Sequence, residues 1–172
     1  MGIVRDIFEG ITTGLVTATR DPPRPSLGPG PGTRDPGRID RFCRALGWSI
    51  DGRDGDAVEL HFRNPTGGIA IVRVESADED WVLFSAHSAA VLPVSTVPPE
   101  VTGYLLRQNA ALAAGGWAAI VSPSSAVAFG LLYRTPGPGL CPASFQLVCE
   151  SMAREAAEFD ARLAAAGLLR RP

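Results

Sequence analysis

A proline- and glycine-rich run, DPPRPSLGPGPGTRDPG at positions 21–37, divides the chain into two unequal parts. Proline removes backbone donors and fixes φ, and glycine raises the entropic cost of ordering, so neither a helix nor a strand can persist here. The segment is predicted to be a linker. It separates an N-terminal segment at residues 1–20 from a folded domain at residues 38–169.

The part of the chain after the linker is long enough for one domain, since domains usually contain about 100–150 residues. Hydrophobic residues make up 45% of the 172 residues and charged residues 20%, so a core has enough apolar material. We therefore expect one folded domain with an appended N-terminal segment.

Charge and cysteine content disfavour several kinds of partner and location. Sixteen basic against eighteen acidic residues give a net charge of -2, so there is no overall positive field to bind nucleic acid. Cys43, Cys141 and Cys149 are odd in number and lack metal-type spacing, which predicts free thiols in a reducing cytoplasm. Asp6 and Glu9 interrupt the apolar region of a cleaved signal peptide, and no run of about 18 apolar residues could span a membrane. The expected location is cytoplasmic.

The first twenty residues carry an apolar stripe at spacings of three and four, which is typical of one face of a helix. Gly10 and Gly14 weaken this helix, and an isolated helix of this length is marginal in water, so it needs a surface on which to dock. Two alternatives stay open: it packs on its own domain, or it is an address peptide for another protein or shell. A helix lying in a membrane surface is disfavoured because its polar face has too few cations. The stripe consists of Ile3, Val4, Ile7, Phe8, Ile11 and Leu15.

After the linker, apolar periodicity and turn residues divide the domain into helices and strands. The helical spacing of Ile39, Phe42 and Leu46, followed by Gly47, predicts a helix over residues 38–46. The order helix, three or four strands, helix, two strands, helix predicts an α+β domain with helices packed on an antiparallel sheet. The other predicted elements are a hairpin of strands 48–50 and 58–62 around a turn at 51–56, strands at 69–75 and 81–87, a helix of about fifteen residues between Val97 and Gly115, a hairpin of strands 117–121 and 127–133, and an amphipathic helix of about five turns from near Pro142.

The two central strands are apolar on both faces, unlike an ordinary half-buried strand. An apolar second face needs a cover, and a helix, a second subunit or a partner peptide could each supply it. The core face is predicted to contain Ala70, Val72 and Val74 with Val82, Phe84 and Ala86, and the second face Ile69, Ile71, Trp81 and Leu83.

The two histidines do not form a catalytic or metal-binding pattern. His61 and His87 lie at outward positions of predicted strands, with only Glu59 and Glu75 as loose carboxylate partners. We therefore expect ordinary surface or boundary histidines.

Other candidate motifs for catalysis or ligand binding are each incomplete. The turn serines lack a G-x-S-x-G elbow, GPGPG at 28–32 lacks the strand, the lysine and the amides of a phosphate loop, and the aspartates at 51–56 lack the glutamate of a calcium loop. Cys149 lies on an apolar helical stripe, and Cys141 has no identifiable partner. We predict no catalytic site, no cofactor and no metal. The residues considered are Ser122, Ser124, Ser125, Asp51, Asp54 and Asp56.

The element order, the run LLRQNAALAAGGWAAI at 105–120 and the closing helix SFQLVCESMAREAAEFDARLAAAGLL at 144–169 resemble the type III secretion chaperone-like superfamily, in particular its YbjN-type group. The resemblance covers roughly residues 38–169. It includes a helix ending in Asn109 before a small-residue turn, and a long final helix with Asp160 near its end. The resemblance implies a dimer that holds extended client segments against sheet edges and apolar surface, or that acts as a regulator. The linker, the extra helix and the modest acidity depart from a secretion chaperone and argue against a secretion role.

These observations predict a non-catalytic protein-binding module, a chaperone-like or adaptor protein for a polypeptide client, and the resemblance implies a homodimer. The predicted partner-binding residues are those of the second sheet face, Ile69, Ile71, Trp81 and Leu83, together with Ile3, Ile7, Phe8, Ile11 and Leu15 of the N-terminal stripe. The alternative is a tethered subunit or cargo of a larger bacterial assembly, recruited through residues 1–20.

Overall fold

The computed structural model describes residues 37–64, 67–77, 81–112 and 115–169. The predicted N-terminal helix at residues 1–20 lies outside the described residues, and so does all of the predicted linker except Gly37.

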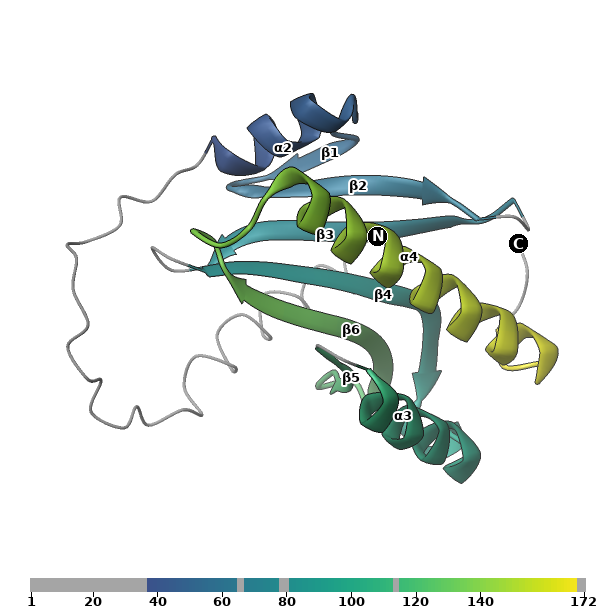
Figure 1. Cartoon of the computed structure of the whole chain (residues 1–172). Coiled ribbons are helices and arrows are strands. Elements are labelled where there is room, and N and C mark those ends of the chain that lie inside the picture. Colours follow the sequence, from purple (N-terminus) through teal and green to yellow (C-terminus); the bar gives the residue numbers. More distant parts are fainter. Residues whose placement is uncertain (1–36, 65–66, 78–80, 113–114, 170–172) are drawn as a thin grey trace, which may run out of the picture.

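The described chain forms one antiparallel six-stranded sheet and three α-helices (Figure 1). The strand order is β1-β2-β3-β4-β6-β5, and every neighbouring pair is antiparallel. The predicted α+β class and element order are therefore confirmed. The elements are α2 (Arg38–Leu46), β1 (Gly52–Asp54), β2 (Ala57–Arg63), β3 (Ile69–Ala77), β4 (Trp81–Pro93), the 3-10 turn η1 (Val94–Thr96), α3 (Pro99–Ala111), β5 (Gly116–Val121), β6 (Ala126–Pro136) and α4 (Pro142–Ala165).

Helix α2 ends where the sequence predicts, because Gly47 adopts a left-handed conformation with φ of 69°. Glycine has no Cβ to clash in this region, and it is the usual residue just beyond a helix C-terminus. The Trp48 N–H then donates to the Cys43 carbonyl at 2.8 Å, which satisfies one of the last carbonyls of the helix.

The prediction of a strand at residues 48–50 is wrong, and the first strand is β1, within the segment predicted to be a turn. Trp48 and Ile50 are apolar because they pack against the core: the Trp48 ring lies 5.3 Å from that of Phe62. The hairpin itself exists, but its tight turn lies at Gly55 with φ of 59°, between the paired residues Asp54 and Ala57.

Helices α3 and α4 begin at prolines. Proline has no backbone N–H, and the N–H groups of the first turn have no acceptor within the helix, so proline is favourable there. Helix α4 also has a capping box, in which the Cys141 N–H donates to the Ser144 hydroxyl at 3.0 Å. It contains 24 residues, more than the five turns predicted, whereas α3 contains 13.

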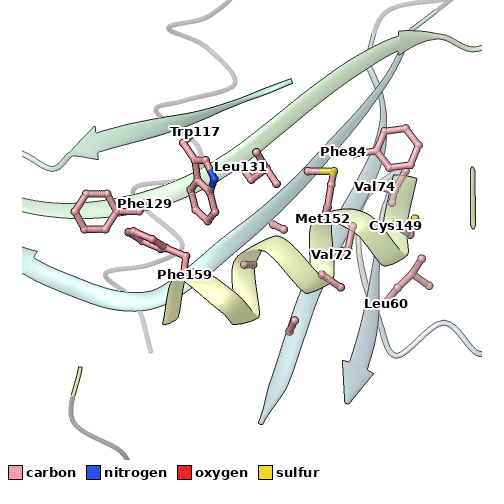
Figure 2. Close-up of a cluster of buried hydrophobic side chains, with 14 of the residues drawn as sticks. Leu60, Val72, Val74, Phe84, Trp117, Phe129, Leu131, Cys149, Met152 and Phe159 are labelled. Atoms are coloured by element: carbon pink, nitrogen blue, oxygen red, sulfur yellow. The ribbon is translucent and has the colours of Figure 1, made fainter. Parts of the chain in front are cut away.

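The hydrophobic core lies between one face of the sheet and the buried stripe of α4, which crosses β3 and β4 (Figures 1 and 2). Residues of alternate parity supply the sheet side of this core, as the sequence predicts. The α4 stripe consists of Phe145, Cys149, Met152, Ala153, Ala156, Phe159 and Leu163, and the predicted core residues Ala70, Val72, Val74, Val82, Phe84 and Ala86 are all buried.

All three described helices lie on this same side of the sheet (Figure 1). The α2 ring of Phe42 lies 5.4 Å from Phe145 of α4. At the other end of α4, Phe159 lies 4.7 Å from Trp117 of β5 and 5.8 Å from Tyr104 of α3. The opposite side of the sheet, which we name the outer face, therefore has no helical cover within the described residues.

A carboxylate of α4 is bonded to an irregularity in β4. The pairing of β4 with β6 shifts between His87 and Val91, so three residues of β4 lie between paired positions where β6 has one. Asp160 of α4 accepts hydrogen bonds there from the Ser88 hydroxyl and from the Ala89 N–H, the latter at 3.1 and 3.2 Å. Burial raises the pKa of Asp160, and the hydrogen bonds from Ser88 and Ala89 oppose this rise.

Candidate protein-binding surface

The outer face exposes large apolar side chains in the middle of the sheet. Ile69 and Ile71 of β3 are 55% and 42% exposed, while Val72 and Val74 on the same strand are fully buried on the core side. Exposed apolar side chains clustered on one face are typical of an interaction surface. The central strands contribute to the outer face Ile69, Ile71, Arg73 and Glu75 of β3, Trp81, Leu83, Ser85 and His87 of β4, and Gly130, Leu132 and Arg134 of β6; Glu59, His61 and Arg63 of β2 and Ala118 and Ile120 of β5 lie on the same face.

The four predicted apolar residues share this face but form two groups. Trp81 pairs with Ala77 and Leu83 pairs with Glu75, near the end of β3 opposite to Ile69 and Ile71. Since a strand rises about 3.3 Å per residue, Ile71 and the Leu83 position lie about 13 Å apart along the sheet. Trp81 and Leu83 are half-buried. The structure thus places two isoleucines at one end and an aromatic group at the other.

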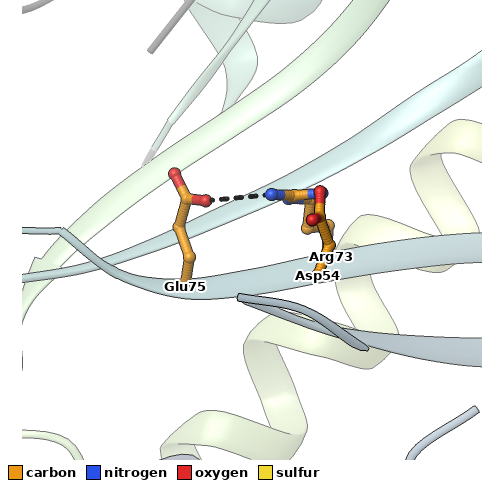
Figure 3. A network of polar contacts seen from close by, with 3 residues as sticks. All are labelled: Asp54, Arg73 and Glu75. Carbon is orange, nitrogen blue, oxygen red and sulfur yellow. Dashed lines mark hydrogen bonds and ion pairs between the residues drawn. The ribbon is translucent and has the colours of Figure 1, made fainter. Parts of the chain in front are cut away.

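A polar strip separates these two groups. The Arg73 guanidinium lies between the carboxylates of Asp54, at 3.0 Å, and Glu75, at 3.5 Å (Figure 3). Glu59 is the cross-strand neighbour of Arg73 on β2. A ligand across the whole face would therefore contact apolar side chains at two ends and charged groups between them.

The aromatic end of the face carries a cation. The Arg134 guanidinium lies 4.8 Å from the centre of the Trp81 ring, a cation–π arrangement. Arg134 and its neighbour Leu132 were not identified from the sequence. The alternation of β6, with Leu131 and Tyr133 toward the core, is the signal from which their outward positions could have been found.

His87 lies on the outer face over a glycine of the next strand. It pairs with Gly130, where an added Cβ would lie only 3.1 Å from the His87 Nε2, so the glycine makes room for the ring. Burial lowers the pKa of His87 to about 4, and the positive charge of Arg73 adds to this effect. The imidazole is therefore neutral at pH 7. His61, by contrast, is exposed, opposite Ile71.

The free edge of the sheet at β5 is partly occupied by a side chain of α3. Asn109 accepts a hydrogen bond from the Trp117 N–H at 2.6 Å and donates to the Trp117 carbonyl at 3.0 Å. This side-chain amide imitates a neighbouring strand for one residue. Because backbone N–H and C=O groups alternate in direction along a strand, those of Ala119 and Val121 point toward the same free edge as those of Trp117. Asn109 was noted in the sequence only as part of a family resemblance, and the structure gives it this physical role.

The cysteines occupy three different environments. Cys43 and Cys149 are buried, and burial raises the pKa of both thiols. Cys141 is exposed at the start of α4, where the hydrogen bond from Ser144 lowers its pKa. None of the three lies on the outer face.

The described residues contain neither a metal-binding cluster nor a membrane-spanning helix. No group of three or more His, Cys, Asp or Glu side chains among them could hold a metal ion. No helix within the described ranges is both long and apolar enough to cross a membrane.

No protein-family model matches the sequence, and no curated protein matches it. Solved structures do match. YbjN from E. coli, described as a putative transcription regulator, is 17% identical with a TM-score of 0.59, covering 86% of this chain and 100% of that one. The chain has the type III secretion chaperone-like fold. This confirms the predicted YbjN-type resemblance at the level of the fold.

Two secretion chaperones share this chaperone-like fold. The Yersinia pestis chaperone SycH, solved with a fragment of YscM2, is 13% identical with a TM-score of 0.50 over 72% of this chain and 97% of that one. The chain matched in the HopA1-SchA chaperone-effector complex is 11% identical with a TM-score of 0.51 over 71% of this chain and 89% of that one. At these identities the likeness concerns the fold alone.

Proposed function

We propose that the chain is a non-catalytic, chaperone-like or adaptor module that binds an extended polypeptide client on the outer face of its sheet. The observation that carries the proposal is the exposure of Ile69 and Ile71, 55% and 42%, on a sheet face that no described helix covers. Two chaperones of the same fold are in complex with protein partners, SycH with a fragment of YscM2 and the chaperone of the HopA1-SchA complex with its effector, which supports the same class of ligand here.

The chemistry of the face indicates what a client segment should contain. Apolar side chains of the client would pack on Ile69 and Ile71 at one end and on Trp81 and Leu83 at the other, about 13 Å apart. An extended segment spans that distance in about four residues, so its two apolar groups should be about four residues apart, with polar residues between them to face Arg73 and Glu75.

The exposed parts of two isoleucines give a useful but moderate affinity. Fully burying an isoleucine contributes about 1.5–3 kcal/mol, and roughly half of each side chain remains to be buried, so the two together contribute about 1.5–3 kcal/mol. That corresponds to a factor of about 10 to 150 in the dissociation constant. The isoleucine end alone therefore does not give tight binding, and the aromatic end must contribute as well.

A matched pair of surface variants tests the proposal. Ile71→Asp places a charge on the outer face, whereas Leu147→Asp places one on α4, where Leu147 is 66% exposed on the helical side of the sheet. Both proteins should fold like the wild type, as shown by circular dichroism and urea unfolding. A client enriched from host extract by the wild type and by Leu147→Asp, but at least 10-fold less by Ile71→Asp, supports the proposal once the purified client binds with the same ranking. Equal recovery of all clients with both variants contradicts it.

The predicted homodimer is part of this proposal and has its own measurement. Size-exclusion chromatography with light scattering should give a mass near twice the 18.1 kDa of one chain. A mass that stays at one chain at high micromolar concentration removes the dimer from the proposal without affecting the outer face.

The alternative, a subunit or cargo recruited through residues 1–20, remains a prediction because those residues lie outside the described part of the chain. The two functions differ in which residues the partner needs. Recruitment through residues 1–20 would be lost in Ile7→Asp and kept in Ile71→Asp. Client binding on the outer face would be lost in Ile71→Asp and kept in Ile7→Asp.

A further inference from the structure

The outer face lacks a helical cover within the described residues, and the same chain has an apolar segment that lacks a surface. The sequence preceding Gly37 contains 36 residues, and its first part carries the apolar stripe that cannot form a stable helix alone. Contact between the two would bury the exposed isoleucines of β3 and would give the apolar stripe a docking surface.

The length of the connecting segment allows this contact. The chain enters the domain at α2, beside β1, where Asp40 of α2 is ion-paired with Arg53 of β1. Residues 21–36 are rich in proline, and at about 3.1 Å per residue they reach about 50 Å. Six strands at a spacing of about 4.8 Å span only about 24 Å, so every strand of the outer face is within reach.

The dimensions and composition of the segment also fit. The thirteen residues from Ile3 to Leu15 make a helix about 20 Å long, which covers the distance of about 13 Å between the two apolar groups of the face. Gly10 and Gly14 follow Ile7 and Ile11 at helical spacing of three, so they lie on the apolar side. Because glycine has no side chain, these two positions let a helix approach a sheet closely.

We propose that residues 3–15 dock on the outer face of their own chain and that a client must displace them. The displacement by a client rests on the proposed function, whereas the docking of residues 3–15 does not. A linker of this kind gives an effective concentration in the millimolar range. If the free segment binds with a dissociation constant of 10 to 100 μM as an order of magnitude, the face is about 90–99% occupied and the client affinity falls about 10- to 100-fold.

Cysteine pairs in the full-length chain test the docking directly. Ile7, Phe8 and Ile11 are changed to cysteine one at a time, each together with Ile71→Cys, in a Cys141→Ser background; Cys43 and Cys149 are buried. Control pairs combine the same three changes with Leu147→Cys, which is exposed on the other side of the sheet. Three positions are used because a disulfide requires Cα atoms within about 7 Å and the register of the segment sets which pair meets this limit.

The expected result is an intramolecular disulfide in at least one Ile71→Cys pair, formed at least 10-fold faster under mild oxidation than in any Leu147→Cys pair. Mass spectrometry of the dilute, unreduced monomer identifies it. Equal rates in both sets, or no disulfide in either, overturn the proposal. Disulfide-linked dimers in dilute solution overturn it as well, since the segment would then dock on a second copy.

A binding measurement separates this inference from the proposed function. The probe is a fluorescent peptide of residues 1–20, MGIVRDIFEGITTGLVTATR. It should bind the full-length double variant with Ile7→Asp and Phe8→Asp at least 10-fold more tightly than the wild type, because the N-terminal segment of that variant no longer occupies the outer face. Addition of Ile71→Asp should abolish the binding. Equal affinity for variant and wild type overturns docking in cis, whereas a client sensitive to Ile71→Asp would still support the proposed function. If residues 3–15 dock on their own chain but no client binds, the docking is supported and the proposed function is contradicted.

Discussion

Replacing Asp160 by alanine should destabilise the domain more than its position on a half-exposed helix suggests. The substitution removes the acceptor of two hydrogen bonds at the irregularity of β4, from the Ser88 hydroxyl and the Ala89 N–H. Ser88 is only 7% exposed, and its hydroxyl also accepts the Ala90 N–H at 3.0 Å. The change therefore affects a short network that fixes the bulged part of β4 to α4.

The size of the effect follows from this geometry. Hydrogen bonds to a charged acceptor contribute about 1.5–3 kcal/mol each, so two of them contribute about 3–6 kcal/mol. Release of the desolvated carboxylate and the higher helix propensity of alanine offset part of this loss, the latter by about 0.5 kcal/mol. We expect Asp160→Ala to lower the free energy of unfolding by about 2–4 kcal/mol. Asp160→Asn keeps one oxygen that can accept both bonds, and it should cost about 1 kcal/mol.

Urea unfolding followed by tryptophan fluorescence measures these differences, provided that the dependence on urea is the same for all variants. Ser88→Ala and the double variant complete a thermodynamic cycle. The coupling energy between Asp160 and Ser88 should be at least about 1 kcal/mol, as expected for residues in one network. Additive effects, or a loss below about 1 kcal/mol in Asp160→Ala, would refute the reasoning.

The pH dependence gives an independent check on Asp160. Burial raises its pKa above the ordinary 3.8, so the folded state binds the proton more tightly than the unfolded state. The stabilising contribution of that proton is complete below pH 3.8 and is lost as the pH rises through the raised pKa. The stability of the wild type relative to Asp160→Asn should therefore decrease as the pH increases from 4 toward neutrality. A difference that is constant or increases over this range contradicts the assignment.

Three further predictions concern other residues. Because burial lowers the pKa of His87 from 6.5 to about 4, the free energy of unfolding should decrease by up to about 3 kcal/mol as the pH falls from 6.5 to 4, and His87→Gln should remove most of this dependence in urea unfolding. Asn109→Ala should lower the free energy of unfolding by about 1–3 kcal/mol through loss of both bonds to Trp117, with Asn109→Asp intermediate; equal losses in the two variants would show that only the donor matters. Cys141 should be the one thiol of three that reacts rapidly with Ellman's reagent in the folded protein, and Ser144→Ala should slow it; rapid reaction of a buried thiol would contradict the structure.

Most helices and strands could be predicted because their signals are local. Helix α2 follows from three apolar residues at helical spacing and a glycine that permits a left-handed turn. Helix α4 follows from an apolar stripe long enough to be distinctive. The first strand was misplaced because Trp48 and Ile50 are apolar for a reason of tertiary packing, which periodicity over three residues cannot distinguish from a strand.

The candidate site could be predicted in part. Alternation along β3 and β4 identified a second apolar face with Ile69, Ile71, Trp81 and Leu83, but it could not say which of these remain exposed or how far apart they lie. Strand register fixes those distances. Arg134 was missed because its position beside Trp81 depends on the pairing of β4 with β6, whose paired residues are about fifty positions apart in the chain.

The sequence by itself determined the class of fold, the places where the three described helices begin and the two-sided character of the central strands, because each depends on the spacing of neighbouring residues. Only the tertiary structure decided that all described helices cover the same side, that Asp160 bonds to β4 seventy-two residues away, and that the half-buried His87 packs over Gly130. These depend on which strands pair and in which register, and that choice is made by the packing of the whole domain.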